Sequence, residues 1–406
     1  MMKKSLIRIG LVGIGNVFNA LLGFAYLSVV AKILDIESFG KYALLTTLLV
    51  AVSKIIDFGT NSVYVADSIS KDDETLLDTF YTLKIILLAV SIPVSVILLT
   101  LLKLNSVNTI LYFILGLVAY AINYTLNSFF QKKQKFFHLI LLNTFPAVIK
   151  GIFALLIILN LVVFDLDKAF MVFSLSIFSS AILWFFLPNE FKKFKFDFTK
   201  VKNFLKKAAP AGVSQLIFEG WPSISNSIAK ITSSFSHVGI FAIAEKVANI
   251  LQLGAISIFT ILLPKNAYAK KRNEKYDFKE VFVISILILV LAFFGTFISR
   301  YFVSDFFDDK YAMSIPLLGL LIFSSAFTSI HNFMENYFFI EEKTNYIMYI
   351  NVGKLVLFLL ISWILIPAYS LRGLAISNLV SAMAALAATI IAISINQRSK
   401  SSKVQE

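Results

Sequence analysis

Cysteine is absent from the 406-residue chain, and histidine occurs only three times. Without cysteine there are no disulfides, thiol nucleophiles or cysteine-based metal and redox sites. The histidines, His138, His237 and His331, are not spaced as a metal-binding pair. Because no nucleotide-binding loop or nucleophile motif occurs either, we expect neither a cofactor nor covalent catalysis.

Charged residues are also scarce. They make up 15% of the chain against 58% hydrophobic residues, and the mean hydropathy is +0.82. Soluble domains contain about 25% charged and about 45–50% apolar residues. A soluble protein of this composition would leave too much apolar surface in water, so the composition predicts an integral membrane protein.

Hydrophobic segments long enough to cross a bilayer recur through the chain. A helix needs about 20 apolar residues to cross about 30 Å of hydrocarbon, and these segments lack the alternation of barrel strands. We therefore predict an all-α membrane protein of about twelve transmembrane helices. The first is expected to be an uncleaved membrane helix, because its apolar stretch exceeds that of a signal peptide. The predicted spans are 6–34, 41–66, 80–102, 107–130, 138–161, 169–187, 208–231, 240–264, 280–303, 312–338, 346–368 and 371–395.

Basic residues are distributed unevenly between the predicted loops. With both termini in the cytoplasm, 24 lysines and arginines fall on cytoplasmic segments and 7 on outer ones. The positive-inside rule favours this orientation, and it accounts for the net charge of +13 without a nucleic-acid partner. Every predicted outer loop is short.

A basic connector lies between the sixth and seventh predicted helices. Residues 190–207, EFKKFKFDFTKVKNFLKK, mix phenylalanines with lysines. Such a segment can lie in the anionic cytoplasmic interface with its rings inserted, or it can be a solvated linker. We expect it to separate a six-helix lobe at 1–189 from a second lobe at 208–395, which a cytoplasmic tail at 396–406 follows.

The two predicted lobes contain matching segments. In the first lobe AKI at 31–33 precedes SFGKYAL at 38–44, and in the second AKI at 229–231 precedes HVGIFAI at 237–243. The offset is 198 residues at the lysines and 199 at the glycines, which indicates one inserted residue between them. Six helices per half is an even number, so the halves are expected to be parallel repeats, as in some transporters.

Four short motifs resemble those of one family in type and order. They are AKILDIESFGKYALL at 31–45, DFG at 57–59, GIFAIAEK at 239–246, and IPAY followed by GLA within 366–375. The chain is similar over most of its length to the multidrug/oligosaccharidyl-lipid/polysaccharide exporter superfamily, and it resembles in particular its Wzx-type O-antigen and polysaccharide flippases. One departure is Phe241, where the family usually has tyrosine, which argues against a role for a hydroxyl at that position.

The resemblance implies a fold and a function. The implied fold is two six-helix lobes arranged as a V, related by a parallel pseudo-two-fold repeat and alternating between inward-open and outward-open states. The implied function is to move undecaprenyl-pyrophosphate-linked oligosaccharide, an O-antigen or capsule repeat unit, from the inner to the outer leaflet of the bacterial inner membrane. Expected partners are this substrate, membrane lipids, a proton or sodium ion for coupling, and the polysaccharide polymerase machinery.

Ionisable residues at membrane depth are costly and are therefore candidates for function. A lipid-linked pyrophosphate needs cations in place of water, and lysine supplies a compact charge with three donors. The candidate cavity lysines are Lys32, Lys54, Lys150, Lys230 and Lys354. The candidate coupling or gating residues are Asp57, Glu219, Glu245, Lys246 and Glu335, and Pro222 is the candidate hinge of a kinked helix.

Each candidate also has a structural interpretation. Lys54 can pair with Asp57 on one helix face, because the two are three residues apart. Lys32 and Lys230 lie near helix ends and can extend to the interface. The buried carboxylates can pair with lysines, and His331 is expected to pack or pair rather than to act in chemistry.

Three other functions are alternatives, and each makes a different demand on the sequence. A cation-coupled multidrug exporter of the same superfamily would favour an acidic or apolar cavity. A polysaccharide polymerase or membrane glycosyltransferase would need a larger outer loop, and a scaffold for cell-envelope enzymes would not need a charged interior. The candidates at or near membrane depth include six lysines and four carboxylates. This excess of positive charge favours an anionic substrate.

Overall fold

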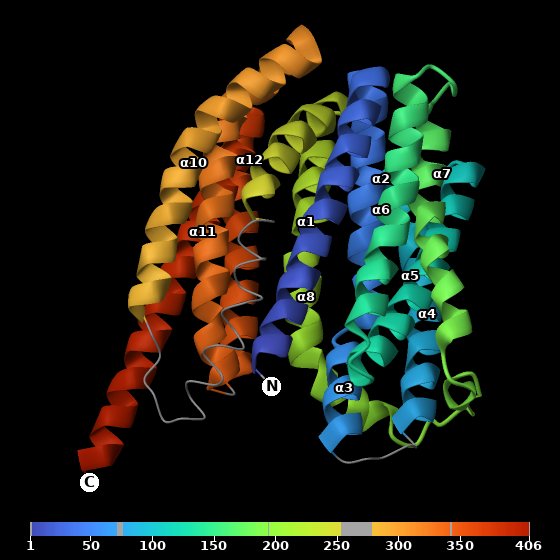
Figure 1. Ribbon diagram of the computed structural model, residues 1–406. Helices are drawn as coiled ribbons and strands as arrows, with labels where there is room; N and C mark the ends of the chain where they lie inside the picture. Colours follow the sequence, from blue (N-terminus) through green and yellow to red (C-terminus); the bar gives the residue numbers. More distant parts are fainter. Residues whose placement is uncertain (1, 71–75, 194, 253–277, 342, 406) are drawn as a thin grey trace. The chain divides into compact units, whose positions relative to one another are not determined.

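The structure is a computed structural model that describes residues 2–70, 76–193, 195–252, 278–341 and 343–405. Within these ranges all regular secondary structure is helical (Figure 1). The chain divides into two compact units, Met1–Gly239 and Ile240–Glu406. The predicted all-α architecture is therefore confirmed for the described part of the chain.

The first unit is a bundle of long helices (Figure 1). It contains α1 (Met2–Ile33), α2 (Ile36–Asp57), α3 (Thr60–Ser70), α4 (Leu76–Leu101), α5 (Val107–Lys132), α6 (Phe136–Ile158), α7 (Leu166–Ser176), the 3-10 helices η1 (Ile177–Phe186) and η2 (Asn189–Phe191), and α8 (Val201–Thr232). A further helix over residues 235–252 begins in this unit and continues into the second.

The second unit contains three long helical segments. They are α10 (Phe278–Phe307), α11 (Ile315–Ile340) and α12 (Thr344–Gln405), with the 3-10 helix η3 (Asp308–Ser314) before α11. Ser370 has φ 49° and ψ −131°, which breaks α12 into two helices. The break lies between the predicted spans 346–368 and 371–395, so two predicted helices are joined with almost no loop.

The predicted spans correspond to observed helices throughout the described residues. Eight helical segments there are long and apolar enough to cross a membrane, and the last of them, Asn345–Gln397, holds the two spans divided at Ser370. The predicted spans 6–34 and 208–231 fall on α1 and α8. The helix α8 begins at Val201, so the end of the predicted linker 190–207 is helical. Part of the predicted span 240–264 and most of the basic loop after it lie outside the described residues.

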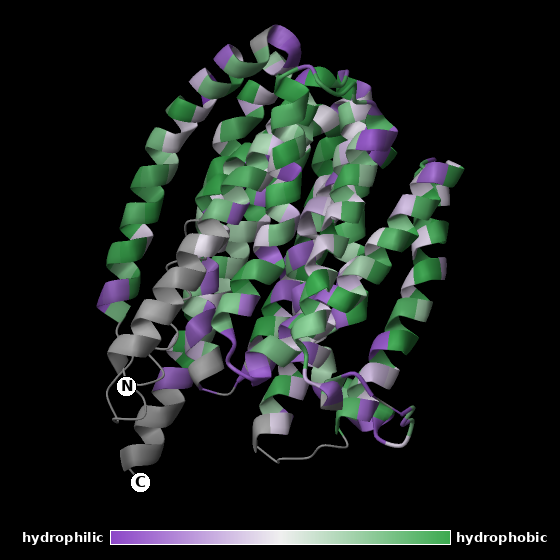
Figure 2. Cartoon of the chain, turned by 45° about the vertical axis from the view of Figure 1, so that its right-hand side comes forward, coloured by the Kyte–Doolittle hydropathy of each residue, from purple (hydrophilic) through white to green (hydrophobic). Residues whose placement is uncertain are grey.

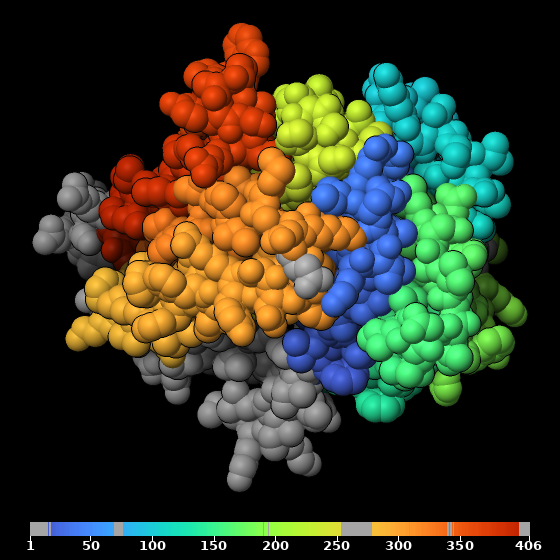
Figure 3. Space-filling model, turned by 90° about the horizontal axis from the view of Figure 1, so that it is seen from above, coloured from blue at the N-terminus to red at the C-terminus, as the bar shows by residue number. Residues whose placement is uncertain are grey.

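The helix α2 lies at the centre of the first unit. It packs against α4, α5, α7 and α8, while α1 packs against α6. Nearly every side chain from Phe39 to Leu49 is buried, because this segment has neighbours on all sides. Figure 3 shows the blue N-terminal helices against the green residues around α6. A polar residue placed on α2 therefore meets other helices rather than lipid.

Many helices present apolar side chains outward. In α10, Phe293, Phe294, Phe297 and Ile298 are more than half exposed. Only 22% of the apolar stretch that qualifies this helix as a membrane span is buried. Figure 2 shows hydrophobic residues along most of the helical length, with hydrophilic residues gathered mainly toward helix ends and connections. Such surfaces need lipid as solvent, so the chain is a multi-pass membrane protein.

Equivalent N-caps begin α2 and the helix at 235–252. The Asp35 carboxylate accepts a hydrogen bond from Ser38 N at 2.9 Å, and the Ser234 hydroxyl accepts one from His237 N at 3.4 Å. These bonds satisfy backbone donors that have no intrahelical partner. The hydrogen bonding with Ser38 also lowers the pKa of Asp35. Asp35 and Ser234 are 199 residues apart, the same offset as between Gly40 and Gly239.

These two helices cross at a pair of glycines in a reciprocal contact. A Cβ on Gly40 would overlap the Phe235 carbonyl, and a Cβ on Gly239 would overlap the Ile36 carbonyl, since each would lie within 3.0 Å of the carbonyl oxygen. Phe235 is four residues before Gly239, and Ile36 is four residues before Gly40. Each glycine therefore contacts the carbonyl four residues before the other glycine, and the contact stays the same when the two repeats are exchanged. The parallel repeat therefore has a direct structural counterpart at this crossing.

The helix ends keep the same register. The helices α1 and α8 end at Ile33 and Thr232, so their ends have the same spacing in the sequence as the two glycines, without an insertion before the glycines. Lys32 and Lys230 are therefore offset by one residue in the repeat, which corresponds to about 100° around a helix.

We expect Gly40→Ala to destabilise the protein by about 1–3 kcal/mol, because the added methyl group overlaps the backbone of residues 235–239. The matched control is Gly23→Ala in α1, where a Cβ meets no described atom within 4 Å. This control should be neutral or slightly stabilising, since alanine favours helix. Apparent unfolding temperatures of the purified variants in detergent test the difference. Equal temperatures for the two variants would contradict the close crossing.

Candidate functional site

The main polar cluster of the first unit is built around a break between α2 and α3. Phe58 and Gly59 adopt positive φ values of 36° and 71°, which end α2 and redirect the chain. The break packs tightly on α8, because a Cβ on Gly59 would lie 2.6 Å from the Ala208 carbonyl and one on Gly212 would lie 2.6 Å from the Phe58 carbonyl. The DFG motif at 57–59 thus marks the end of a helix inside a membrane-spanning segment.

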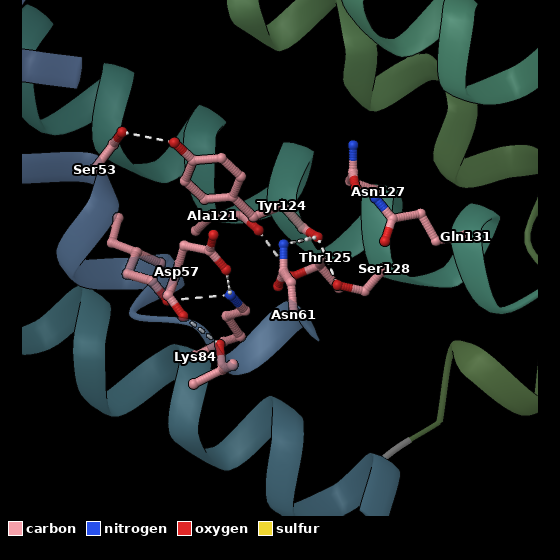
Figure 4. Close-up of polar contacts among 12 residues, drawn as sticks. Ser53, Asp57, Asn61, Lys84, Ala121, Tyr124, Thr125, Asn127, Ser128 and Gln131 are labelled. Atoms are coloured by element: carbon pink, nitrogen blue, oxygen red, sulfur yellow. Dashed lines mark hydrogen bonds and ion pairs between the residues drawn. The ribbon is translucent and has the colours of Figure 1, made fainter. Parts of the chain in front are cut away.

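Lys84 of α4 satisfies the open end of α2. Its Nζ donates to the Ile56 carbonyl at 3.1 Å and to the Asp57 carboxylate at 3.4 Å. Both side chains of the ion pair are at least nine-tenths buried. A cation at a helix C-terminus interacts favourably with the helix dipole and with unpaired carbonyls. Figure 4 shows Lys84 directed at Asp57 beneath the break.

Tyr124 of α5 joins this cluster to the rest of α2. Its hydroxyl lies 2.9 Å from the Ser53 hydroxyl, and its backbone carbonyl accepts a hydrogen bond from the Asn61 side chain at 3.2 Å (Figure 4). The ammonium groups of Lys54 and Lys84 lie 4.9 and 5.7 Å from its ring centroid. Tyr124 therefore contributes a cation–π contact to both lysines.

Lys54 forms the accessible part of the cluster. Its Nζ lies 3.3 Å from the Glu219 carboxylate on α8, and the two side chains are 13% and 41% exposed. Lys54 and Asp57 were expected to be able to pair with each other. Instead they form ion pairs with different helices, Lys54 with α8 and Asp57 with α4. A lysine held by an exposed carboxylate and an aromatic face can exchange that carboxylate for another anion.

The other candidates of the first unit lie outside this cluster. The Lys150 ammonium sits 5.1 Å from the Phe173 ring centroid, between α6 and α7. Lys32 is exposed in the last turn of α1, and the Lys230 ammonium lies 4.4 Å from the ring centroid of Phe235. The helix α8 continues through Pro222 without a break, so a hinge there stays a prediction.

The second unit holds a separate polar network between α11 and α12. The Glu335 carboxylate lies 3.1 Å from His331 Nε2 and accepts a hydrogen bond from Asn351 at 3.2 Å. His331 Nδ1 lies 2.9 Å from the Thr389 hydroxyl. This network connects α11 to both halves of α12 (residues 344–369 and 371–405), and it gives His331 the pairing role expected for it.

Three more candidates are in the second unit. Lys354 is buried and donates to the Thr328 hydroxyl at 3.3 Å. Glu245 is 6% exposed, and its Oε2 has no hydrogen-bond partner among the described residues. Lys246 follows it on the same helix and is half-buried. A buried carboxylate oxygen without a donor is costly, so Glu245 is a candidate to bind a proton or a cation.

Sequence reasoning missed Lys84 and Tyr124. Lys84 lies just inside the start of the predicted span 80–102, and its partner Asp57 belongs to another helix. Tyr124 carries no charge, so only its neighbours in space distinguish it from the other tyrosines. The sequence signal that could have indicated this site was the presence of Ser, Asn and Tyr residues within the otherwise apolar helices α2, α3 and α5, such as Ser53, Asn61 and Tyr124.

The fold defines the class of protein. Its similarity to the structure titled "Inward-facing conformation of a multidrug resistance MATE family transporter of the MOP superfamily" has a TM-score of 0.74 at 14% identity, covering 96% of this chain and 99% of that one. A MATE structure in complex with MaD3S gives 0.64 at 16% identity, over 100% and 97% of the chains. The D35N mutant of the Vibrio cholerae MATE transporter VcmN gives 0.61 at 14% identity, over 98% of each chain. The chain has the two-lobed transporter fold of this superfamily.

The sequence defines the family within that class. The profile of the family described as "Polysaccharide biosynthesis protein" matches residues 8–267, and the chain belongs to this family. The comparison with curated proteins finds no match. The resemblance inferred from the short motifs is thus confirmed at the level of family and fold, and the solved structures of similar fold are titled as transporters.

We expect Lys84→Met to destabilise the protein by about 3–5 kcal/mol, because it leaves the buried Asp57 carboxylate and the end of α2 without a cation. The double variant Lys84→Met/Asp57→Asn should recover part of that loss, since no unpaired charge remains. Unfolding of the four proteins in detergent gives the double-mutant cycle. Purely additive effects would contradict the ion pair.

Proposed function

We propose that this protein is a flippase that carries undecaprenyl-pyrophosphate-linked oligosaccharide, an O-antigen or capsule repeat unit, from the inner to the outer leaflet by alternating access. It acts in the bacterial inner membrane, multi-pass and with both termini in the cytoplasm. The polysaccharide-biosynthesis family and the transporter fold support this proposal. The observation that carries it is the partly accessible Lys54, held between Glu219 and Tyr124.

The geometry around Lys54 suits a phosphate ligand. On insertion scales a lysine at the centre of a bilayer costs about 2.5–3.5 kcal/mol, so a partner must compensate it. Glu219 supplies that partner when no substrate is bound, and its exposure allows a diphosphate to replace it. In this proposal Lys32, Lys150, Lys230 and Lys354 add positive potential along the substrate path.

Carboxylates and their partners provide coupling and gating in this mechanism. Glu219 is freed from Lys54 when the diphosphate binds, and Asp57 stays with Lys84 throughout. Glu335 and Glu245 are the carboxylates of the second unit that bind and release the coupling proton or sodium ion. Lys246 acts at the gate beside Glu245.

A multidrug exporter is the second candidate, because the similar structures include transporters titled for multidrug resistance. It predicts a different substrate charge. A cationic drug would bind Glu219 and be repelled by Lys54, whereas an anionic lipid would do the reverse.

The experiment is a deletion strain in which lipid-linked oligosaccharide and surface polysaccharide are measured together. We expect the lipid-linked unit to accumulate and the surface polymer to disappear, with rescue by the wild-type gene. Lys54→Gln should rescue at least about tenfold less well, since one charged hydrogen bond to phosphate is lost. Lys150→Ala should also rescue less well.

Lys168→Gln is the matched control. Lys168 forms an exposed ion pair with Asp165 at 3.9 Å, and its loss should leave rescue unchanged. Unchanged lipid intermediates with an intact surface polymer would reject the flippase. If the deletion strain is sensitive to cationic drugs and the Lys54→Gln variant restores its resistance, the protein is an exporter instead.

A further inference from the structure

The start of the segment between η1 and α8 is held against the first unit by a buried ring. This linker loop (residues 187–200) holds Phe191 against Phe129 with ring centroids 4.4 Å apart, and the Tyr81 hydroxyl donates to the Phe191 carbonyl at 2.6 Å. The Lys132 and Lys133 ammonium groups, at the end of α5, lie 5.8 and 5.1 Å from the Phe191 ring centroid. The start of the linker loop is thus packed into the helical bundle.

The middle of the linker loop is bonded to the beginning of α4. Asp78 accepts a hydrogen bond from Lys195 N at 2.8 Å, and Thr82 accepts one from Asp197 N at 2.9 Å. The Asp197 carboxylate accepts hydrogen bonds from Thr79 at 2.6 Å and from Thr199 N at 2.9 Å. The hydrogen bonds from Thr199 and Thr79 lower the pKa of Asp197 to about 2, so it remains an ionised acceptor in the cell.

These hydrogen bonds determine the position of the loop along the axis of α4. Thr82 is six residues into α4, which is about 9 Å along the helix axis. The loop therefore folds back beside the first turns of a membrane-spanning helix and does not extend away from the helix ends. Because α4 is long and apolar enough to cross a membrane, the loop near Asp197 lies beside one end of a candidate membrane span.

The exposed residues of the linker loop include both apolar rings and positive charges. Phe196 and Phe198 are 61% and 65% exposed, and their rings stack with centroids 6.2 Å apart at 14°. The same loop carries four exposed lysines, Lys192, Lys193, Lys195 and Lys200. Phe191 in the same loop is only 5% exposed, so burial of the outer rings is not needed to hold the loop.

We propose that Phe196 and Phe198, with the four exposed lysines of the same loop, form a docking surface that inserts into the headgroup region of an anionic bilayer. Stacked exposed rings are unfavourable in water but suit the boundary between headgroups and acyl chains. The lysines of the same loop match the charge of anionic headgroups. The surface tethers the loop before α8, the helix that carries Glu219, to the lipid.

The absence of cysteine makes a direct depth measurement possible. Full-length Phe198→Cys, labelled with an environment-sensitive fluorophore, is placed in nanodiscs that carry nitroxide lipids near the headgroup. The control is Asn189→Cys, on an exposed residue of the same loop outside the ring pair. We expect at least twofold stronger quenching at position 198 than at position 189, and stronger quenching in anionic than in neutral discs.

The charge requirement is tested on the same label. In Phe198→Cys combined with Lys192→Gln, Lys193→Gln and Lys195→Gln, quenching in anionic discs should fall to the level of neutral discs. Phe196→Cys repeats the measurement if the label at position 198 disturbs folding. Equally weak quenching at positions 198 and 189 would overturn the insertion. Quenching independent of the lysines and of lipid charge would overturn the selection of anionic lipid.

Discussion

The polar backbone of a helix that ends inside a membrane must find partners within the protein, since lipid supplies none. The first unit meets this constraint at Phe58 and Gly59, where α2 stops within a membrane-spanning segment. Lys84 bonds the last carbonyls and Asp57, and the backbone of α8 closes over the break. The positions of Tyr124, Asn61 and Ser53 follow from the same local need for hydrogen bonds.

This arrangement separates two lysines that look alike in the sequence. Lys84 is almost fully buried and is committed to the end of a helix, so it is poorly placed to bind and release a ligand. Lys54 shares the Tyr124 ring with it, but its partner Glu219 is 41% exposed. A buried pair therefore lies within about one turn of a more exposed pair on the same helix, because Lys54 and Asp57 are three residues apart on α2.

Most of the fold is predictable from the sequence, because lipid imposes a length and a composition on every helix. The limits of α4, α5 and α6 follow from apolar runs, and the division of α12 falls where a loop was expected. The pairing of charges is not predictable in the same way. Lys54 has a possible partner on its own helix, yet it pairs with Glu219 from α8, which is distant in the sequence. Only the packing of α2 between α4 and α8 decides the partners.

The short-range pairs show the opposite case. His331 and Glu335 are four residues apart on α11 and do pair, although Glu335 was expected to pair with a lysine; the i, i+4 spacing was a signal in the sequence that this expectation did not use. The register of the repeat needed the structure. The matching helix ends and N-caps agree with the offset of the two glycines, whereas the lysines alone suggested a shorter one.

The crossing of Gly40 and Gly239 has a consequence for how such a chain can change over evolutionary time. A contact that is unchanged on exchanging the repeats is the intramolecular equivalent of an isologous dimer interface, in which one surface meets its own copy. A half-length ancestor with this surface would form a homodimer through a single glycine, and one mutation would alter both sides at once. In the fused chain each side mutates separately, so a bulkier residue at one position still meets the original backbone at the other. The residues beside the two glycines already differ, with Phe39 before Gly40 and Val238 before Gly239, while both glycines are present at the crossing.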